Sequence, residues 1–281
     1  MKRVRQLSEE FDQIETIHSL TGVFETIASM RIGRIKDQVL SSSLFFNELW
    51  QVYGSLRVGA KAADLHLLRS GHRIDKSVFV LITSEGGLSG DIDQLIIRAM
   101  KADYDPAKVD LVVIGYHGVV LLAQQGLAPK HFFRLPSTDA PVDVAPVIAT
   151  ITPYKQAYIY YQKYVSLAKQ SAQRIALISA VRDLSGNKVP AQQIISPAEF
   201  VFEPSTREVI TYLEKVMLGI ALGQTILESR LSQLASRFNA MSLAQEKAQD
   251  ISDDLKRQFF GAKRALSDER IREVITSMEA L

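Results

Sequence analysis

Proline is confined to the middle of this chain, and its distribution limits what the two ends can form. Residues 1–68 contain no proline, and none lies between Ser205 and Leu281, whereas seven of the nine fall between Pro129 and Pro197. In both terminal regions, apolar residues recur at intervals of three and four, the spacing of one face of a helix. Both runs exceed the 8–20 residues of an ordinary globular helix. A helix of about 55 residues measures roughly 80 Å at 1.5 Å per residue.

The terminal runs have the periodicity of a coiled coil. Intervals alternating between three and four give the 3.5-residue period of a left-handed coiled coil. Ser205 and Glu208 form a capping box at the start of the C-terminal run. The N-terminal series is Val4, Leu7, Phe11, Ile14, Ile17, Leu20, Phe24 and Ile27, resuming at Ile32. The C-terminal series is Leu213, Val216, Ile220, Gly223, Leu227, Leu231, Leu234, Phe238, Met241, Ala248, Leu255 and Phe259.

The middle region alternates between strand and helix patterns. Buried-strand runs are predicted at 78–83, 109–114 and 174–181, with shorter strands at Phe132-Phe133 and 198–202. Helices are predicted at 91–102, 119–125 and 142–168, the last bent or broken at Pro153. Strands alternating with helices imply βαβ units and a mostly parallel sheet. The middle region is therefore predicted to be a Rossmann-like α/β domain.

The three regions predict one architecture. Two long helices with apolar seams would each leave a stripe in water unless they pair, and they are expected to pair antiparallel. The predicted fold class is α/β, with a long antiparallel coiled coil of N- and C-terminal helices and an inserted Rossmann-like domain. The expected boundaries are 1–68 for the N-terminal helix, 75–203 for the α/β domain and 204–281 for the C-terminal helix.

Composition excludes several classes of function. The net charge is only +2, whereas a dedicated nucleic-acid-binding domain is usually far more basic. The chain has no cysteine, which excludes disulfides, thiolate catalysis and Cys-based metal sites. No targeting segment is visible, and no stretch reaches the ~18 apolar residues of a bilayer span. A soluble protein that contacts membranes only through partners is expected.

The glycine-rich loop after the first predicted strand invites a nucleotide-binding interpretation, but its residues argue against it. Gly86-Gly87-Leu88-Ser89-Gly90 matches neither G-x-G-x-x-G nor a P-loop. Asp91 and Asp93 would also place negative charge where phosphate binds. A structural turn is favoured, with no nucleotide binding and no cofactor.

Other chemistry-bearing residues also favour structural roles. The five histidines form no H-x-x-x-H or H-E-x-x-H pair, so no metal site is predicted. Ser84 and Ser89 have no recognisable base partner in the sequence. The tyrosines between Tyr154 and Tyr164 are conceivable as a stacking platform for RNA. A helix that packs these rings on the sheet is the favoured interpretation.

Three stretches resemble the γ subunit of bacterial F-type ATP synthases. Residues 84–93 (Ser-Glu-Gly-Gly-Leu-Ser-Gly-Asp-Ile-Asp) are similar to the family's Ser-Asp-Arg-Gly-Leu-Cys-Gly-Gly-Leu-Asn. Residues 20–31 look like Ile-Thr-Lys-Ala-Met-Glu-Met-Val-Ala-Ala-Ser-Lys. Residues 235–241 (Ala-Ser-Arg-Phe-Asn-Ala-Met), followed by Ala244, Ala248, Asp254 and Leu255, are similar to Ala-Ala-Arg-Met-Asn-Ala-Met…Ala…Asp-Leu. Their order and the chain length also match the family.

The sequence departs from the family at several positions. Gly86 replaces an Arg, while Gly22 and Thr26 replace a Lys and a Met. Near the C-terminus, where the family has Ala-Arg-Gln-Ala-Ala-Ile-Thr, Arg264 is kept but the Gln and the Ile-Thr are lost. This pattern resembles a divergent branch, with the alternative, often sodium-linked N-type ATPases as the candidate.

The resemblance implies a central-stalk rotor subunit with no active site of its own. Its implied partners are the α, β and ε subunits and the membrane c-ring, at the cytoplasmic face of a bacterial membrane. The implied contacts with α and β are Glu25, Arg31, Arg237 and Arg264. The implied structural loop of the α/β domain consists of Ser84, Glu85, Gly87, Leu88 and Gly90.

Two alternatives of other classes remain. A non-ATPase coiled-coil scaffold with an α/β head would self-associate without α and β. An enzyme on the Rossmann-like domain would need a polar catalytic constellation near residues 84–90. The coupling ion, proton or sodium, is a property of the c-ring, and neither it nor the direction of the reaction follows from this chain.

Overall fold

The computed structural model describes residues 2–59, 74–136, 140, 142–177, 203 and 205–279. The first and last elements of the chain are two long helices, α1 (Lys2–Gly59) and α6 (Thr206–Glu279). Between them lie β1 (Ile74–Ile82), α2 (Ile92–Asp103), β2 (Val109–Ile114), α3 (Tyr116–Gln124), β3 (His131–Phe133), α4 (Ala145–Ile151), β4 (Tyr154–Tyr164) and β5 (Gln170–Ala176). This arrangement confirms the predicted fold class. The strand predicted at 198–202 lies outside the described residues.

The strands form one mostly parallel sheet in the order β3-β2-β1-β4-β5. β1 pairs in parallel with both β2 and β4, and β2 with β3, while β5 runs antiparallel to β4. The side chains of β1 alternate between two cores, as the two-residue period of a strand requires. Val78, Val80 and Ile82 enter one core, and Phe79 and Leu81 enter the other.

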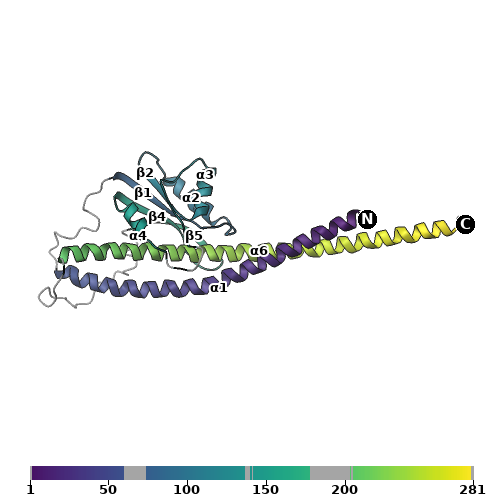
Figure 1. Cartoon of the computed structure of the whole chain (residues 1–281), viewed down its shortest axis with the longest axis horizontal. Coiled ribbons are helices and arrows are strands. Elements are labelled where there is room, and N and C mark those ends of the chain that lie inside the picture. The colour runs from purple at the N-terminus through teal and green to yellow at the C-terminus, as the bar shows by residue number, and fades with distance from the viewer. Residues whose placement is uncertain are drawn as a thin grey trace. The chain divides into compact units, whose positions relative to one another are not determined.

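The two faces of the sheet are covered by different helices (Figure 1). One core lies under α2 and α3 and includes Ile96, Met100 and Leu122. The other combines α4 with residues of both long helices, among them Phe46 and Tyr53 of α1. From α6 it takes Met217, Leu218, Ala221, Leu222 and Ile226, each at most 1% exposed. Burying one such Leu, Ile or Met side chain contributes roughly 1.5–3 kcal/mol.

The chain divides into two compact units, one comprising Met1–Ser29 with Arg237–Leu281 and the other Met30–Ser236. In the first unit α1 and α6 run antiparallel. The hydroxyl of Ser252 donates to Glu15 (2.7 Å), and Lys256 lies 5.2 Å from the centre of the Phe11 ring. In the second unit the pairing is again antiparallel. Gln224 donates to Ser43 (3.0 Å), and the hydroxyl of Tyr53 donates to Glu214 (3.0 Å).

The helix predicted at 142–168 is wrong. α4 ends at Ile151, and residues 154–164 form the strand β4. Pro153 stops the helix because it cannot continue the hydrogen-bond ladder. Tyr and Ile beyond it favour a pleated, half-buried surface, and pairing with β1 and β5 realises that preference. The tyrosine cluster therefore lies on a strand, where the rings of Tyr158 and Tyr160 pack against Phe79.

The predicted seam of α1 is partly wrong. Ile17, Leu20, Phe24 and Ile27 are exposed by 47%, 52%, 39% and 37%. The buried positions of this part of the helix are instead Leu7, Thr21 and Ala28, with Ile35 continuing the seven-residue spacing. Small and polar side chains stand at Thr21 and Ala28, so a pattern based on large apolar residues favours the wrong face.

Gly115 follows β2 and lies in close contact with Thr83, the residue after β1. Its φ is +101°, and a Cβ there would lie 2.1 Å from the carbonyl oxygen of Thr83. Gly115→Ala should lower the free energy of unfolding by more than about 4 kcal/mol, as for severe core lesions. Gly126 has a φ of +73° but open space around it, so Gly126→Ala should cost only the about 1–2 kcal/mol of left-handed strain. Chemical denaturation of the full chain measures both. Equal losses of stability in the two variants would contradict the predicted clash between a Cβ at position 115 and the carbonyl oxygen of Thr83.

Candidate functional site

The glycine-rich loop joins β1 to α2 and is held by buried side chains at both ends. Ser84 and Ser89 are each 2% exposed, whereas Leu88 is 57% exposed with a φ of +65°. Gly90 has the same φ, and a Cβ added there would lie 3.3 Å from the hydroxyl of Ser236 on α6. Gly87 has open space around it. The loop is thus a tight turn whose second half lies against α6.

Glu85 occupies the position where a helix N-terminus would bind an anion. Its carboxylate accepts hydrogen bonds from the backbone N–H groups of Tyr116 (3.2 Å), at the start of α3, and Leu135 (3.0 Å). Arg134 lies 3.9 Å from the same carboxylate. Donors that cradle phosphate in nucleotide-binding folds are here satisfied by a side chain of the chain itself. This geometry argues against phosphate binding at the N-terminus of α3.

Asp93 is the centre of a buried polar cluster that sequence reasoning missed. It is 1% exposed and accepts hydrogen bonds from the backbone N–H of Ser84 (3.2 Å), the Ser84 hydroxyl, His117 Nδ1 (2.7 Å) and Gln162 Nε2 (2.8 Å). His117 and Gln162 lie far from the loop in sequence, so spacing carried no signal for them. From the sequence, Asp93 indicates only a negative charge that disfavours phosphate binding, and its role in a buried cluster is not predicted.

The Ser84–Asp93–His117 cluster is not a nucleophile–base–acid triad. His117 Nδ1 donates to Asp93, so it has no lone pair with which to take the Ser84 proton 3.4 Å away. Ser84 is also closed to a substrate, since it is 2% exposed. The cluster therefore satisfies buried polar groups, and it does not supply the catalytic constellation that the alternative enzyme interpretation would need near Ser84.

His117 makes the stability of this cluster depend on pH. The hydrogen bond to Asp93 raises the pKa of His117 above its ordinary value of 6.5. Two further charged groups, Glu85 and Arg134, contact Tyr116 at this end of α3. A raised pKa means that the folded state binds the proton more tightly than the unfolded chain does. The resulting stability is complete below the ordinary pKa and is lost as pH rises through the raised one.

The free energy of unfolding should therefore fall as pH rises from the ordinary histidine pKa through the raised pKa of His117, and His117→Gln should remove part of that fall because the glutamine does not titrate. Denaturant unfolding of the full chain at several pH values measures the slope. The matched control is His131→Gln, at an exposed position of β3, which should keep the wild-type slope. A slope unchanged by His117→Gln would contradict the assignment.

The four residues implied as rotor contacts lie at separate places on the long helices. Glu25 of α1 is half-buried in the first unit, and Arg31 is half-buried in the second. Arg237 of α6 is half-buried and Arg264 is exposed, both in the first unit. Among the described residues, Arg264 makes no ion pair or hydrogen bond that its own chain would have to break.

The first unit also has two exposed apolar stripes. On α1 the stripe comprises Ile17, Leu20, Val23, Phe24 and Ile27, exposed by 37–55%. Near the end of α6, Ile271, Val274, Ile275 and Met278 are exposed by 50–72% and follow helical spacing. Contiguous exposed apolar surface marks a surface that a partner covers.

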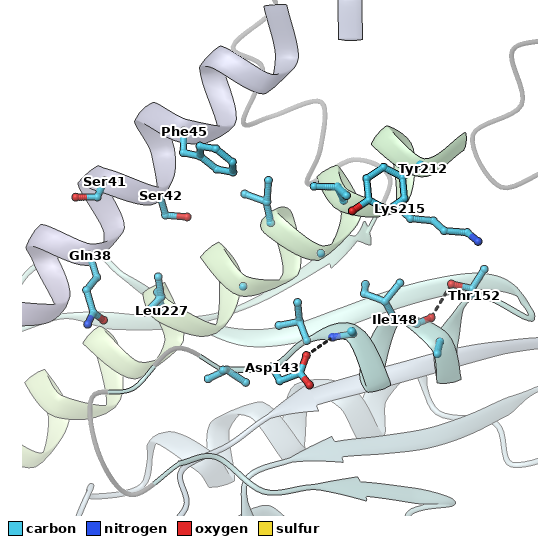
Figure 2. Close-up of a pocket in the computed structure, with 18 of the residues that line it drawn as sticks. Gln38, Ser41, Ser42, Phe45, Asp143, Ile148, Thr152, Tyr212, Lys215 and Leu227 are labelled. Carbon is cyan, nitrogen blue, oxygen red and sulfur yellow. Dashed lines mark hydrogen bonds between the residues drawn. The ribbon is translucent and has the colours of Figure 1, made fainter. Parts of the chain in front are cut away.

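The second unit contains an apolar groove between α1, α4 and α6, with a volume of about 1100 Å³ (Figure 2). Phe45 of α1, Ile148 of α4 and Leu227 of α6 lie around it. Its polar rim includes Gln38, Asp143 and Lys215, and Asp143 accepts a hydrogen bond from the Ala145 backbone N–H (3.0 Å). The groove has no concentration of titratable groups suited to catalysis.

The described parts of the chain contain no cluster of three or more His, Asp or Glu side chains that would hold a metal ion. Within the same residues, no helix is both long and apolar enough to cross a bilayer.

Comparisons with known proteins agree with one another. The model of a family described as ATP synthase matches residues 3–281. The chain is 22% identical over 320 residues to the chloroplastic ATP synthase gamma chain of Trieres chinensis, covering 99% of this chain and 84% of the relative.

Solved structures show the same fold. A chain in the mitochondrial ATP synthase of Euglena gracilis, solved as OSCP/F1/c-ring in rotational state 3, matches with a TM-score of 0.71 and 13% identity, over 99% of this chain and 94% of that one. The rotor of the same enzyme in rotational state 1 matches with a TM-score of 0.65 and 12% identity, over 94% and 99%. The central stalk and c-ring of the Tetrahymena thermophila mitochondrial enzyme match with a TM-score of 0.57 and 16% identity, over 80% and 99%.

Proposed function

The chain belongs to the γ-subunit family of ATP synthases and is a central-stalk rotor subunit, and we propose that it couples ion flow to ATP chemistry by rotating as one asymmetric shaft. The observation that carries this proposal is the pair of long helices with exposed apolar stripes in the first unit. A surface that turns against several partners must bind each of them weakly and reversibly. Exposed apolar stripes with scattered charges suit that task better than a deep pocket.

Catalysis belongs to other subunits of the complex. The γ orientation would favour a different conformation of each β subunit through differential contact energy, which is a population shift. We propose that α and β surround the stripes of the first unit and that ε and the c-ring bind the α/β domain. The groove between α1, α4 and α6 (Figure 2) offers further apolar surface to a partner subunit beside the α/β domain. We further propose that residues 1–68, 75–203 and 204–281 act as the functional divisions of the chain.

The protein is peripheral to the membrane as part of the synthase. We propose the cytoplasmic face of a bacterial membrane, on the resemblance of residues 84–93 and 235–241 to bacterial sequences, although the relatives above are chloroplastic and mitochondrial. The transported ion is a proton or sodium, set by the c-ring. Measuring ATP-driven pumping of each ion by vesicles containing the complex decides between them.

Arg264 is proposed as a catch for β-subunit loops. Its planar fork can grip carboxylate or carbonyl oxygens through two parallel bonds, and a catch that must release gains only about 1.5–3 kcal/mol per charged hydrogen bond. Arg264→Ala should lower turnover or coupling roughly tenfold, because 1.4 kcal/mol is a factor of 10, without unfolding the chain. ATP hydrolysis and ion pumping by reconstituted complex measure this.

Two matched variants control that experiment. Arg264→Lys keeps the charge but not the fork and should show an intermediate effect. Arg270→Ala removes another exposed arginine of α6 and should leave coupling unchanged. Wild-type turnover and coupling in fully assembled Arg264→Ala complex would place the catch elsewhere, and loss of assembly would make Arg264 structural.

The exposed stripe of α1 provides a second test. Leu20 is 52% exposed, so Leu20→Asp should change the stability of the isolated chain by less than about 0.5 kcal/mol, as at ordinary surface positions. Burial of the same charge against α and β subunits would be costly, so assembly should weaken at least tenfold. Ser29→Asp adds the same charge on the opposite side of α1, since nine residues at 100° bring it half a turn round. Gel filtration of titrated complexes compares the two, and equal assembly would refute the stripe as a contact surface.

A further inference from the structure

The α/β domain (β1–β5 with α2–α4) contacts α6 through two chemically different regions of the helix. The first region, residues 217–226, is apolar: Met217, Leu218, Ala221, Leu222 and Ile226 pack into the core that includes α4 and β4. The second region follows it along the helix and is polar and buried: Ser229, Ser232 and Gln233 are at most 6% exposed. Ser229, Gln233 and Ser236 of α6 donate hydrogen bonds to the α/β domain in this second region.

Gln162 of β4 is the side chain on which the polar contact depends. It is 0% exposed, and its two ends bind different parts of the protein. The amide nitrogen donates to Asp93 of α2 (2.8 Å), while the amide oxygen accepts from the hydroxyl of Ser229 and from Gln233 Nε2 (3.3 Å). Only an acceptor faces the nitrogen and only donors face the oxygen, so the orientation of the amide is determined by its partners.

The groups that bind Gln162 make further hydrogen bonds of their own. Asp93 is further held by Ser84 and by His117 Nδ1 (2.7 Å). The Ser229 hydroxyl, which donates to Gln162, also accepts from Gln233 (3.1 Å). Further along α6, the Ser236 hydroxyl donates to the carbonyl oxygen of Ser89 (2.6 Å). A continuous series of hydrogen bonds thus links half-buried His117 of α3 to buried side chains of α2, β4 and α6.

The two regions resist different motions. Apolar contact is non-directional, so it opposes separation of the domain from α6 more than it opposes sliding or rotation. Hydrogen bonds weaken steeply with angle, and a buried polar group that loses its partner has no water to replace it. Small rotations of the domain about α6 are therefore opposed mainly by the polar region.

We propose that Gln162 is a positioning residue for energy coupling: with Asp93 and Ser229 it forms the joint that fixes the angle of the α/β domain on α6, so that torque applied to the domain reaches the shaft without elastic loss. The inference rests on the proposed function, because torque enters this joint only if the c-ring drives the α/β domain. It assigns to three buried polar residues a mechanical role that catalysis elsewhere in the complex depends on.

Two serines of α6 provide a matched test. Ser229 and Ser232 are both 0% exposed, but among the described residues the Ser232 hydroxyl has no hydrogen-bond partner. Each variant, Ser229→Ala or Ser232→Ala, is assembled with ε, the c-ring and immobilised α and β subunits. A rod attached to the α/β domain reports the angular variance of that domain while catalysis is stalled.

Ser229→Ala should at least double the angular variance of the wild type and lower the ions pumped per ATP under load, while unloaded hydrolysis stays within twofold. Ser232→Ala should match the wild type in all three. Thermal unfolding of both chains separates this effect from general destabilisation. Equal variance in Ser229→Ala and Ser232→Ala would overturn the proposal.

A charge exchange tests the direction of the bonds. Gln162→Glu places a carboxylate against Asp93 and should raise the variance further. Adding Asp93→Asn lets the new amide donate to the carboxylate introduced at position 162, while Ser229 and Gln233 still donate to that carboxylate. The double variant should therefore recover at least half of the lost stiffness or, if the single variant fails to assemble, recover assembly. Absence of rescue would count against the joint. If the wild-type complex itself shows no rotation of this chain, the rotor function fails instead, an outcome distinct from failure of the joint.

Discussion

The packing of α6 against the sheet is the interaction on which the rest of this structure depends. The face from Met217 to Ile226 completes a core that the sheet cannot close by itself, since α2 and α3 cover only the other side. The same helix pairs with α1, whose Phe46 and Tyr53 enter that core too. Because this stretch of α6 packs against both the sheet and α1, its apolar surface must be wider than the narrow stripe of a two-stranded coiled coil.

This double use explains why the domain and the helices behave as one compact unit between Met30 and Ser236. A rotor needs that property, because a flexible attachment would store energy as deformation. The hydrogen bonds of Gln162 with Ser229 and Gln233 further restrict the angle between the α/β domain and α6. Buried polar networks are poor evidence for stability, and their recurrent use is to select one arrangement among several of similar energy.

The α/β domain keeps the topology of a nucleotide-binding fold, while one of its own carboxylates occupies the N-terminus of α3 and another is buried among side chains. Glu85 bonds the N-terminus of α3, and Asp93 lies in the first turn of α2 with four donors around it. The fold is thus reused as a rigid body, which agrees with the rule that function belongs to sites rather than to folds.

Much of this was determined by the sequence alone. Proline-free termini with three-and-four spacing specify long helices, and the runs around Val78 and Val109 specify buried parallel strands, because these patterns are local. The resemblance of residues 235–241 and 84–93 to a known family supplied the function. What only the tertiary structure decided depends on contacts between distant residues. Pairing with β1 and β5 made residues 154–164 a strand, and close approach of α6 made Thr21 and Ala28 part of the seam in place of Leu20 and Phe24. Asp93, His117, Gln162 and Ser229 have no motif in common. They meet only because the sheet order places β4 beside β1 and because α6 packs against one face of the sheet.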